Sequence, residues 1–410
     1  MEKLVFRLVG PVEFARAAVA RLTLGMTPFE RVSWFSWSAC MLVMSVIVAL
    51  RPSRGITHVY RVAAYHWWAG EPIYSEGVHG FLYLPSSAVL FSPFAFMPFH
   101  LGGMAWRWTA FVLLTWAVCR LTKLALPDQF WRSTLCLILL AAIPASTVNL
   151  VRAQSEVIMV ALMIHAAVDI GRFRWWRATI ALSLAVGIKP LALVMLLLVA
   201  VVVPQMRWRL ALGMVFVLLL PFVNPDPFYV MSQYQAMAHK LMVAVAPGPG
   251  RWNELTALLR HFQLDPSEQT MTVARLIGAA GTLGLATLAM RRHGQARGSI
   301  ILLALAVCYQ LLFNPRTEDG SYLNLAMLAG MFAGISWYVE NRRWPACGLI
   351  ILCLGLGTHM YGDWIYRPTD LWLKPLLGVV FALYLVHRIF DVDTESRGCV
   401  GLSPAMVPST

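Results

Sequence analysis

Charged residues are scarce in this sequence. Only 13% of its 410 residues are charged and 59% are hydrophobic, whereas a soluble chain of this length has about a quarter charged residues. Many apolar runs lie near or above the ~18–20 residues that cross a bilayer as a helix. The composition therefore excludes a soluble multidomain protein, and it predicts an all-α, polytopic integral membrane protein.

Recognisable metal-binding and disulfide motifs are also lacking. None of the seven cysteines has the spacing of a zinc site, and six of them lie inside apolar stretches, where single cysteines behave as small hydrophobes. The histidines of segment 58–79 are not arranged as HExxH, and no paired carboxylates of the DxD type accompany them. We therefore expect no metal and no cofactor.

Acidic residues are outnumbered by basic ones, which gives a net charge of +13. The basic residues fall in short loops between apolar segments, where they set the topology and meet anionic lipid headgroups. This distribution predicts membrane lipids as partners, and it argues against a nucleic-acid partner.

Apolar segments that could span a membrane recur along the chain and predict about 12–13 transmembrane helices. The candidate spans are 34–50, 82–98, 104–120, 131–147, 154–170, 175–188, 190–204, 208–223, 271–290, 298–313, 321–339, 345–361 and 371–389. The pair that meets at Lys189 and Pro190 is typical of two half-depth helices. Segment 82–98 contains three prolines, and we expect it to be irregular and not to cross the membrane fully.

The distribution of lysine and arginine defines an orientation. The basic, amphipathic residues 1–33, which lack the apolar core of a signal peptide, and most basic loops belong on one side, which the positive-inside rule makes cytoplasmic. The other side receives two large outer loops, 51–81 and 224–269, whose aromatic and amphipathic stretches predict interfacial helices. We expect a transmembrane domain over 34–390, a disordered cytoplasmic tail over 391–410, and a bacterial inner (plasma) membrane as the location.

Unusual polar residues collect on the outer side. The stretch FNPRTEDGSY, residues 313–322, places Arg316, Glu318 and Asp319 at the end of an apolar segment. Lys189 lies between two half-depth helices, and an ionisable residue at membrane depth is a functional candidate by default. Three ionisable residues within one turn exceed what helix capping requires. We therefore expect a polar cleft at the outer leaflet, suited to a substrate with an apolar tail and a polar head.

Each of these signals also has an ordinary structural explanation. A lysine at the end of a span can extend its ammonium group to the lipid headgroups. Glu156 opens a span, and an acidic residue stabilises a helix N-terminus. Arg316 can be the surface partner of Glu318 and Asp319, and such a pair contributes little to stability. The sequence leaves both explanations open.

Four motifs, in order along the chain, resemble those of one family. The first outer loop of glycosyltransferase family 87 is similar to the stretch that contains Tyr60, Ala63, Ala64, Gly70 and Pro72-Ile73-Tyr74 and continues as GFLYLPSSAVLFSPFAFMPF. RAQSEVIMVAL, LSLAVGIKPLALVMLLL and NPRTEDGSY are similar to later motifs of this family. The resemblance extends over roughly residues 50–340. The family comprises polyprenol-phosphate-mannose-dependent α-mannosyltransferases of the GT-C superfamily.

The resemblance implies a GT-C-like fold and an inverting transfer of a hexose, mannose in this family, from a polyprenyl-phosphate donor to a lipid or glycan acceptor. Such a transfer needs a carboxylate base and cations beside the departing phosphate. The family's base is an aspartate a few residues before the tyrosine that aligns with Tyr60, but RGITHVY contains no acid. The candidate bases are therefore Glu318, then Glu71, with Glu76 and His58 as further alternatives. The candidate phosphate ligands are Lys189, Arg316 and Arg61, and the remaining cleft candidates are Tyr60, Gln154, Glu156 and Asp319.

Two other functions remain open at this point. A transporter or flippase of lipid-linked sugars would share the apolar groove and the charged residues, but it would string its polar groups along a path through the membrane. A catalytically silent scaffold descended from a transferase is the second alternative, because the expected aspartate is missing. The transferase hypothesis requires a carboxylate, Lys189 and Arg316 to converge.

Overall fold

The computed structural model describes residues 25–51, 54–245 and 252–391. Most of the predicted amphipathic N-terminus and all but one residue of the predicted C-terminal tail lie outside the described residues. Within the described ranges all regular structure is helical. The elements are α2 (Pro28–Leu50), α3 (Thr57–Ala69), α4 (Pro85–Ala95), α5 (Phe99–Ala125), α6 (Trp131–Ala141), α7 (Ile143–Arg152), α8 (Glu156–Gly171), α9 (Trp175–Ile188), η2 (Pro190–Ala192), α10 (Leu193–Val202), η3 (Pro204–Met206), α11 (Arg207–Leu219), η4 (Leu220–Val223), α12 (Pro227–Val245), α13 (Leu255–His261), α14 (Glu268–Phe313), η5 (Asp319–Tyr322), α15 (Leu323–Gly334), η6 (Ile335–Val339), α16 (Arg343–Gly355), η7 (Thr358–Tyr361), α17 (Asp363–Thr369) and α18 (Leu373–Phe390).

The first described helix, α2, starts at a capping box. The Thr27 hydroxyl accepts a hydrogen bond from the Glu30 amide at 3.2 Å, and the Glu30 carboxylate accepts one from the Thr27 amide at 2.9 Å. Pro28 occupies the first helical turn, where its missing N–H costs nothing. The helix therefore begins where its sequence satisfies the free amides of its first turn.

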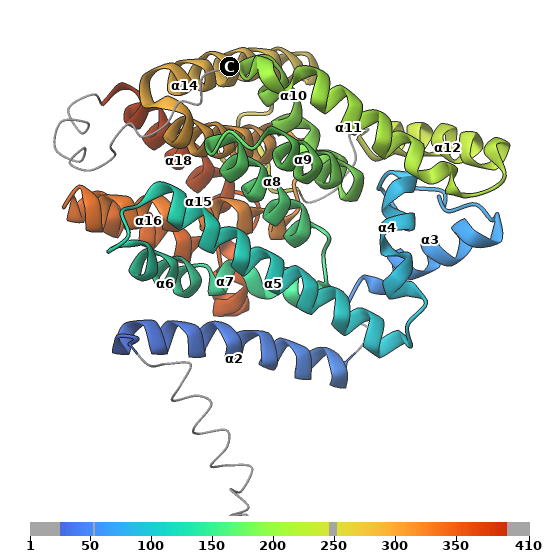
Figure 1. The fold of residues 1–410 in the computed structure, drawn as a ribbon, viewed down its shortest axis with the longest axis horizontal. Helices are drawn as coiled ribbons and strands as arrows, with labels where there is room; N and C mark the ends of the chain where they lie inside the picture. The colour runs from blue at the N-terminus through green and yellow to red at the C-terminus, as the bar shows by residue number, and fades with distance from the viewer. Residues whose placement is uncertain (1–24, 52–53, 246–251, 392–410) are drawn as a thin grey trace, which may run out of the picture.

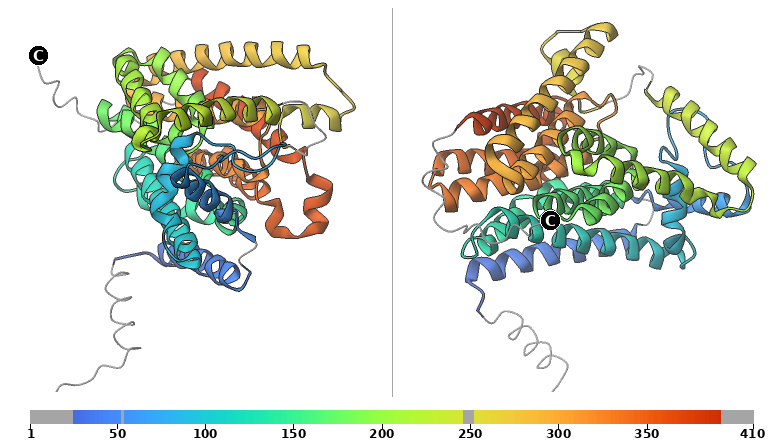
Figure 2. Two further views of the ribbon diagram at one scale, coloured as in Figure 1. Left: turned by 90° about the vertical axis from the view of Figure 1, so that its right-hand side faces the viewer. Right: turned by 45° about the horizontal axis from the view of Figure 1, so that its top comes forward.

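Helices α2 and α5 run side by side, and α3 of the first outer loop lies with α12 of the second at one end. In Figure 1 α2 lies along the lower edge, α5 lies beside it, and α14 lies along the upper edge. The helices α3, α4 and α12 lie together at the right-hand end, and the turned views of Figure 2 keep them adjacent. The three amphipathic stretches of the outer loops form helices α3, α12 and α13 (Leu255–His261), and their interfacial position stays a prediction.

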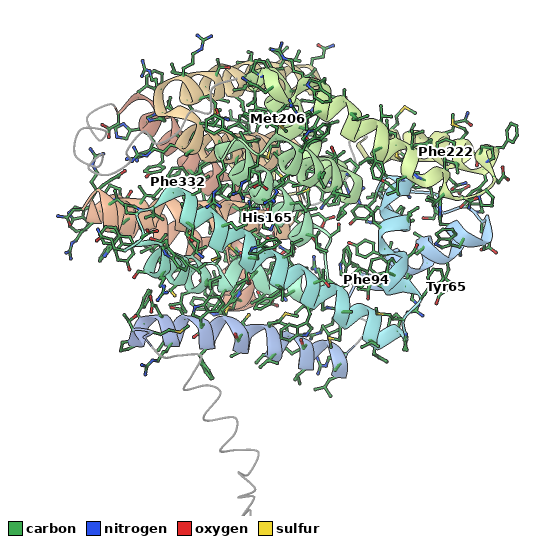
Figure 3. All side chains as sticks on the ribbon, in the orientation of Figure 1. Tyr65, Phe94, His165, Met206, Phe222 and Phe332 are labelled. Carbon is green, nitrogen blue, oxygen red and sulfur yellow. The ribbon has the colours of Figure 1, made fainter. Side chains whose placement is uncertain are left out.

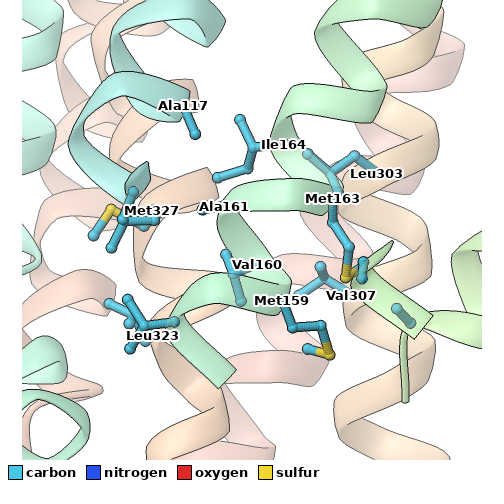
Figure 4. Close-up of a cluster of buried hydrophobic side chains, with 14 of the residues drawn as sticks. Ala117, Met159, Val160, Ala161, Met163, Ile164, Leu303, Val307, Leu323 and Met327 are labelled. Carbon is cyan, nitrogen blue, oxygen red and sulfur yellow. The ribbon is translucent and has the colours of Figure 1, made fainter. Parts of the chain in front are cut away.

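Helix α8 forms the centre of the core. Fifteen of its sixteen residues are buried, and it packs against α5, α9 and α14. Figure 4 shows Met159 and Met163 of α8 among Leu303 and Val307 of α14, with Met327 of α15 close by. Apolar residues occur around most of the circumference of α8, which is typical of a helix that other helices surround. Any polar residue at its ends is therefore held by protein on every side.

Other helices present apolar side chains outward. On α2, Phe35, Leu42 and Val46 are exposed, and on α11 Leu212 and Phe216 are exposed. Figure 3 shows side chains covering the whole ribbon, with Phe222 and Tyr65 near the right-hand end and His165 in the middle. Apolar surface of this extent on long helices is typical of contact with lipid. The chain is a polytopic helical membrane protein.

The number of helices that can cross a bilayer alone is smaller than the number of predicted segments. Six described helices are long and apolar enough, or seven if the pair α6–α7, bent by 62°, counts as one span. Helices occur in each of the thirteen predicted segments, but several are short. One of the six, α14, is two helices joined at Gly294, whose φ of 69° breaks the helical path. The expected 12–13 spans therefore include short helices, such as the 14 residues of α9 and the 13 of α16.

Breaks within the predicted segments concentrate where polar residues lie. Segment 82–98 forms only the 11-residue helix α4, with Pro93 inside it; at ~1.5 Å per residue it is too short to cross a bilayer alone. The chain is extended at Lys189, between α9 and η2, as expected for two helices meeting there. These breaks bring backbone polar groups and charged side chains together in the interior.

Candidate functional site

The junction between α7 and α8, residues 153–155, carries the first part of the site. Helix α7 ends at Arg152, and Ala153 takes a left-handed conformation with φ of 56°. Two residues of α5 hold this junction: the Trp106 indole donates to the Ala153 carbonyl at 3.1 Å, and the Arg107 guanidinium donates to the Leu150 and Val151 carbonyls at 3.1 and 3.0 Å. These bonds satisfy carbonyls that a helix end leaves free. Gln154 and Glu156 therefore have fixed positions.

Two tyrosines lie against the start of α8. The Tyr60 hydroxyl of α3 accepts a hydrogen bond from the Ser155 amide at 3.2 Å, and its oxygen lies 3.1 Å from the hydroxyl oxygen of Tyr83. Burial raises the pKa of Tyr60 well above its usual value. Burial, and then the charge of Glu318, raise the pKa of Tyr83 to about 12. Both hydroxyls are therefore protonated near neutral pH and act as hydrogen-bonding groups.

A buried ion pair joins α8 to the break after α9. The Lys189 ammonium bonds to one carboxylate oxygen of Glu156, which is fully buried. The other carboxylate oxygen accepts a hydrogen bond from the Asn324 amide of α15 at 3.2 Å. Both oxygens of Glu156 are thus engaged. Such a buried pair is costly to desolvate and costly to break, so it fixes three elements relative to one another.

Glu318 lies at the centre of the polar residues. One of its carboxylate oxygens accepts a hydrogen bond from the Gln154 side chain at 2.9 Å. Its charge acts on Lys189, Arg316 and Tyr83. In contrast to Glu156, Glu318 is only partly buried. We define the polar cluster as the set of side chains linked in this way: Tyr60, Tyr83, Gln154, Glu156, Lys189, Arg316, Glu318 and Asn324.

Arg316 is oriented by contacts that leave part of its guanidinium unused. Its Nη1 donates to the Val78 carbonyl at 2.7 Å, and its guanidinium carbon lies 4.5 Å from the ring centroid of Trp252. Its Nε is buried and has no hydrogen-bond partner among the described residues. Burial lowers the pKa of Arg316, but arginine stays charged in proteins. The edge formed by Nε and Nη2 is one with which arginine binds a carboxylate or phosphate in a bidentate manner.

Asp319, the neighbour of Glu318, belongs to a second set of contacts. Its carboxylate bonds to the ammonium of Lys374, lies 2.6 Å from Nε2 of His359, and accepts a hydrogen bond from Asn253 at 3.1 Å. These partners come from α18, η7 and the chain before α13. Asp319 is thus a structural anchor that fixes the peptide carrying Glu318.

The remaining candidates lie apart from the polar cluster in their contacts. Arg61 donates to the Met97 carbonyl at 2.8 Å and to the Tyr65 hydroxyl at 2.9 Å. It lines a separate, shallow depression of the surface. Glu71 is exposed and lies 3.4 Å from His66. His58 and Glu76 are also exposed. No hydrogen bond or ion pair among the described residues joins these four side chains to the cluster.

Several buried polar atoms around the cluster are unsatisfied. Among the described residues, Oε1 of Gln154, Oγ of Ser155, Oδ1 of Asn324 and Nε of Arg316 have no hydrogen-bond partner. Buried polar groups are otherwise almost always paired, so a ligand or water is the natural partner here. No three His, Cys, Asp or Glu side chains in the described part of the chain converge as a metal site. The expectation of no metal stays a prediction.

Sequence reasoning missed several residues of the site. Tyr83, Ser155, Asn324 and Trp252 contact its members, and Lys374 anchors Asp319. Lys374 had a visible signal, because LKPL repeats the IKPL pattern that singled out Lys189. Asn324 is a polar residue within an apolar helix, which is also a signal. Trp252 had none, since its contact is purely tertiary.

Gly320 provides a test of the local packing. A Cβ atom at this position would lie 2.3 Å from Oδ1 of Asn149, whose amide donates to the Gly320 carbonyl at 2.6 Å. We expect Gly320→Ala to lower the free energy of unfolding by about 1–3 kcal/mol, measured by thermal unfolding in detergent. Gly281→Ala is the matched control, because nothing lies within 4 Å of its Cβ position. Equal stability of the two variants would contradict the packing.

The fold and the polar cluster together define a class: a multi-pass helical membrane protein in which buried charges from separate helices converge at breaks in those helices. The model of glycosyltransferase family 87 matches residues 81–315, more than half of the chain. The chain therefore belongs to glycosyltransferase family 87 and is a membrane glycosyltransferase. The matched range includes Tyr83, Gln154, Glu156 and Lys189, and it ends one residue before Arg316. No curated protein matches the chain.

Proposed function

We propose that this glycosyltransferase transfers a hexose, mannose in the first instance, from a polyprenyl-phosphate donor to a hydroxyl group of a lipid or glycan acceptor. The observation that carries the proposal is that one partly exposed carboxylate, Glu318, acts electrostatically on two cations, Lys189 and Arg316. A base for the acceptor hydroxyl and positive charge for the departing phosphate are the groups that this transfer requires.

The proposed reaction is a single inverting displacement. The acceptor oxygen attacks C1 of the sugar and forms the new C–O bond. The bond between C1 and the phosphate oxygen breaks, and its electron pair leaves with the polyprenyl phosphate. The acceptor proton passes to Glu318. Lys189 and Arg316 stabilise the negative charge that grows on the leaving phosphate.

Glu318 is the preferred base because one of its oxygens remains available. Gln154 bonds to Oε2, which orients the carboxylate and leaves Oε1 for the acceptor. Glu156 is a poorer candidate, since it is fully buried and both of its oxygens are engaged. Glu71 and Glu76 are exposed and have no described contact with the cluster. The acid of the NPRTED turn thus substitutes for the aspartate that the first loop lacks.

The apolar tail of the donor needs a groove beside these charges. Helix α4 follows Tyr83 directly and packs on α3, α5 and α9. Phe91 and Phe94 of α4, with Phe99, line the shallow apolar depression beside Arg61. We assign the lipid tail to this proline-rich segment. The reaction is assigned to the side opposite the basic loops, which in a bacterium is the periplasmic side of the inner membrane; the positive-inside rule supports this assignment.

The donor assignment can be tested at Arg316. We expect Arg316→Ala to weaken binding of polyprenyl-phosphate mannose at least tenfold, because a bidentate charge-assisted contact is lost. The measurement is equilibrium binding of radiolabelled donor to the purified protein. Arg260→Ala is the control, since Arg260 is an exposed arginine of the second outer loop that pairs with Asp265. Unchanged donor binding by Arg316→Ala would remove Arg316 from the site.

Failure of the unmodified protein to bind or turn over this donor would contradict the proposed donor class. The same preparation should then be tested for movement of a lipid-linked sugar across liposomes. Accumulation of transported sugar without any transferred product would favour the transporter alternative.

A further inference from the structure

Residues 75–80, with the sequence SEGVHG, form a loop that we call the strap. Two of its glycines, Gly77 and Gly80, have φ of 78° and 106°, a region that other residues rarely adopt. A Cβ atom on Gly80 would lie 2.6 Å from the Ser75 hydroxyl oxygen. The strap side chains are exposed, so its shape depends on its backbone contacts. Besides a bond from the Ser75 hydroxyl to the His79 carbonyl at 3.5 Å, those contacts are made by two cations.

Lys240 of α12 is the first of these cations. Its ammonium donates to the carbonyls of Ser75, Gly77 and His79 at 2.7, 2.7 and 2.6 Å. The side chain is 3% exposed. An ammonium group has three donors, so all of its hydrogen-bonding capacity is used on one short loop. The three bonds fix alternate carbonyls of the strap toward α12.

These contacts are unusual for a buried lysine. Its three described hydrogen-bond partners are all neutral carbonyls. Burial, and then the positive charge of Arg316, lower the pKa of Lys240. The ammonium of Lys240 and the guanidinium of Arg316 therefore lie near each other, and backbone carbonyl dipoles of the strap stabilise each of them. Such an arrangement costs stability, and it creates a positive potential that favours an anion.

Arg316 contacts the same strap. The Val78 carbonyl that accepts from its Nη1 belongs to the residue between two of the carbonyls that Lys240 binds. Fixing Gly77 and His79 therefore fixes the direction of the Val78 carbonyl. That carbonyl and the Trp252 ring hold the guanidinium so that its Nε, which has no partner among the described residues, stays available.

We infer that Lys240 is a positioning residue for donor binding: by fixing the strap it holds the Val78 carbonyl, and through it Arg316, in the orientation that grips the donor phosphate. The inference rests on the proposed function. Lys240 itself does not touch the phosphate, because its three donors are engaged. Its main effect is on affinity, because Arg316 already contacts the donor phosphate in the bound ground state and the base is unchanged.

The test is a double-mutant cycle in the full-length protein with polyprenyl-phosphate mannose as the probe. Lys240→Met is expected to raise the donor KM about tenfold, with little change in kcat per donor-binding site. In an Arg316→Ala background the same substitution is expected to have no further effect, because its action passes through Arg316. His239→Ala, an exposed neighbour on α12, is the control and should match the unmodified protein.

A second variant tests the same contact independently, in case Lys240→Met does not fold. Gly80→Ala disturbs the strap without changing either cation, and it should reproduce the higher KM and the lack of effect in the Arg316→Ala background. Additive effects of Lys240→Met and Arg316→Ala would overturn the inference while leaving the donor assignment intact. An unmodified protein that does not bind the donor would overturn both.

Discussion

Glu318→Gln is expected to abolish sugar transfer while donor binding remains. Glutamine keeps the size of the side chain and can still bond to Gln154, but it cannot accept the acceptor proton. Loss of a positioned general base typically costs 10²–10⁴-fold in rate. The measurement is turnover of radiolabelled polyprenyl-phosphate mannose by the purified variant, with donor binding measured on the same sample. The number of donor-binding sites gives the amount of folded protein, so it shows whether turnover is lost per folded molecule.

Two comparisons sharpen this prediction. Asp265→Asn changes an exposed carboxylate of the second outer loop and should leave turnover unchanged. Glu71→Gln and Glu76→Gln test the alternative bases of the first loop. Full turnover by Glu318→Gln, together with loss of turnover in either first-loop variant, would move the base to that loop. Loss of donor binding by Glu318→Gln would instead assign Glu318 to the positioning of Arg316.

Lys189→Met is expected to lower the free energy of unfolding by about 3–5 kcal/mol. The substitution leaves the Glu156 carboxylate fully buried with only the Asn324 amide as a described partner. The cost comes from the unpaired buried charge, so it should be visible in thermal unfolding in detergent. Donor binding should weaken as well, because one of the two proposed phosphate cations is lost.

A double variant separates these two effects. Lys189→Met combined with Glu156→Gln removes both charges, and it should recover most of the lost stability, since a neutral pair of similar volume needs no charge compensation. Donor binding should stay weak, because no cation has been restored. Recovery of donor binding in the double variant would show that Lys189 serves only to neutralise Glu156. A destabilisation that persists would contradict the ion pair as its source.

Sequence patterns were informative about the helices and about part of the site. The apolar segments predicted where helices form, and the prolines of 82–98 and of IKPL marked where helices are short or broken. Lys189, Arg316 and Glu318 were selected as ionisable residues at the ends of apolar segments. In the structure the charge of Glu318 acts on both Lys189 and Arg316. Their catalytic roles stay predictions.

Sequence patterns were poor at selecting residues of the first outer loop. Tyr60 and Arg61 are adjacent in α3, but successive residues of a helix point about 100° apart. Tyr60 therefore meets Ser155 and Tyr83, whereas Arg61 meets Tyr65 and Met97. Which face of α3 turns inward depends on α4 and α5, whose positions a motif does not specify. The strap contact of Lys240 is likewise purely tertiary.

The Glu156–Lys189 pair has a consequence for biosynthesis. The two residues lie 33 positions apart, so α8 and α9 form a helical hairpin that contains both charges. An unpaired ionised side chain is costly to place inside the membrane. Paired within the hairpin, the two side chains can enter the lipid as a neutral ion pair before the rest of the protein has been synthesised.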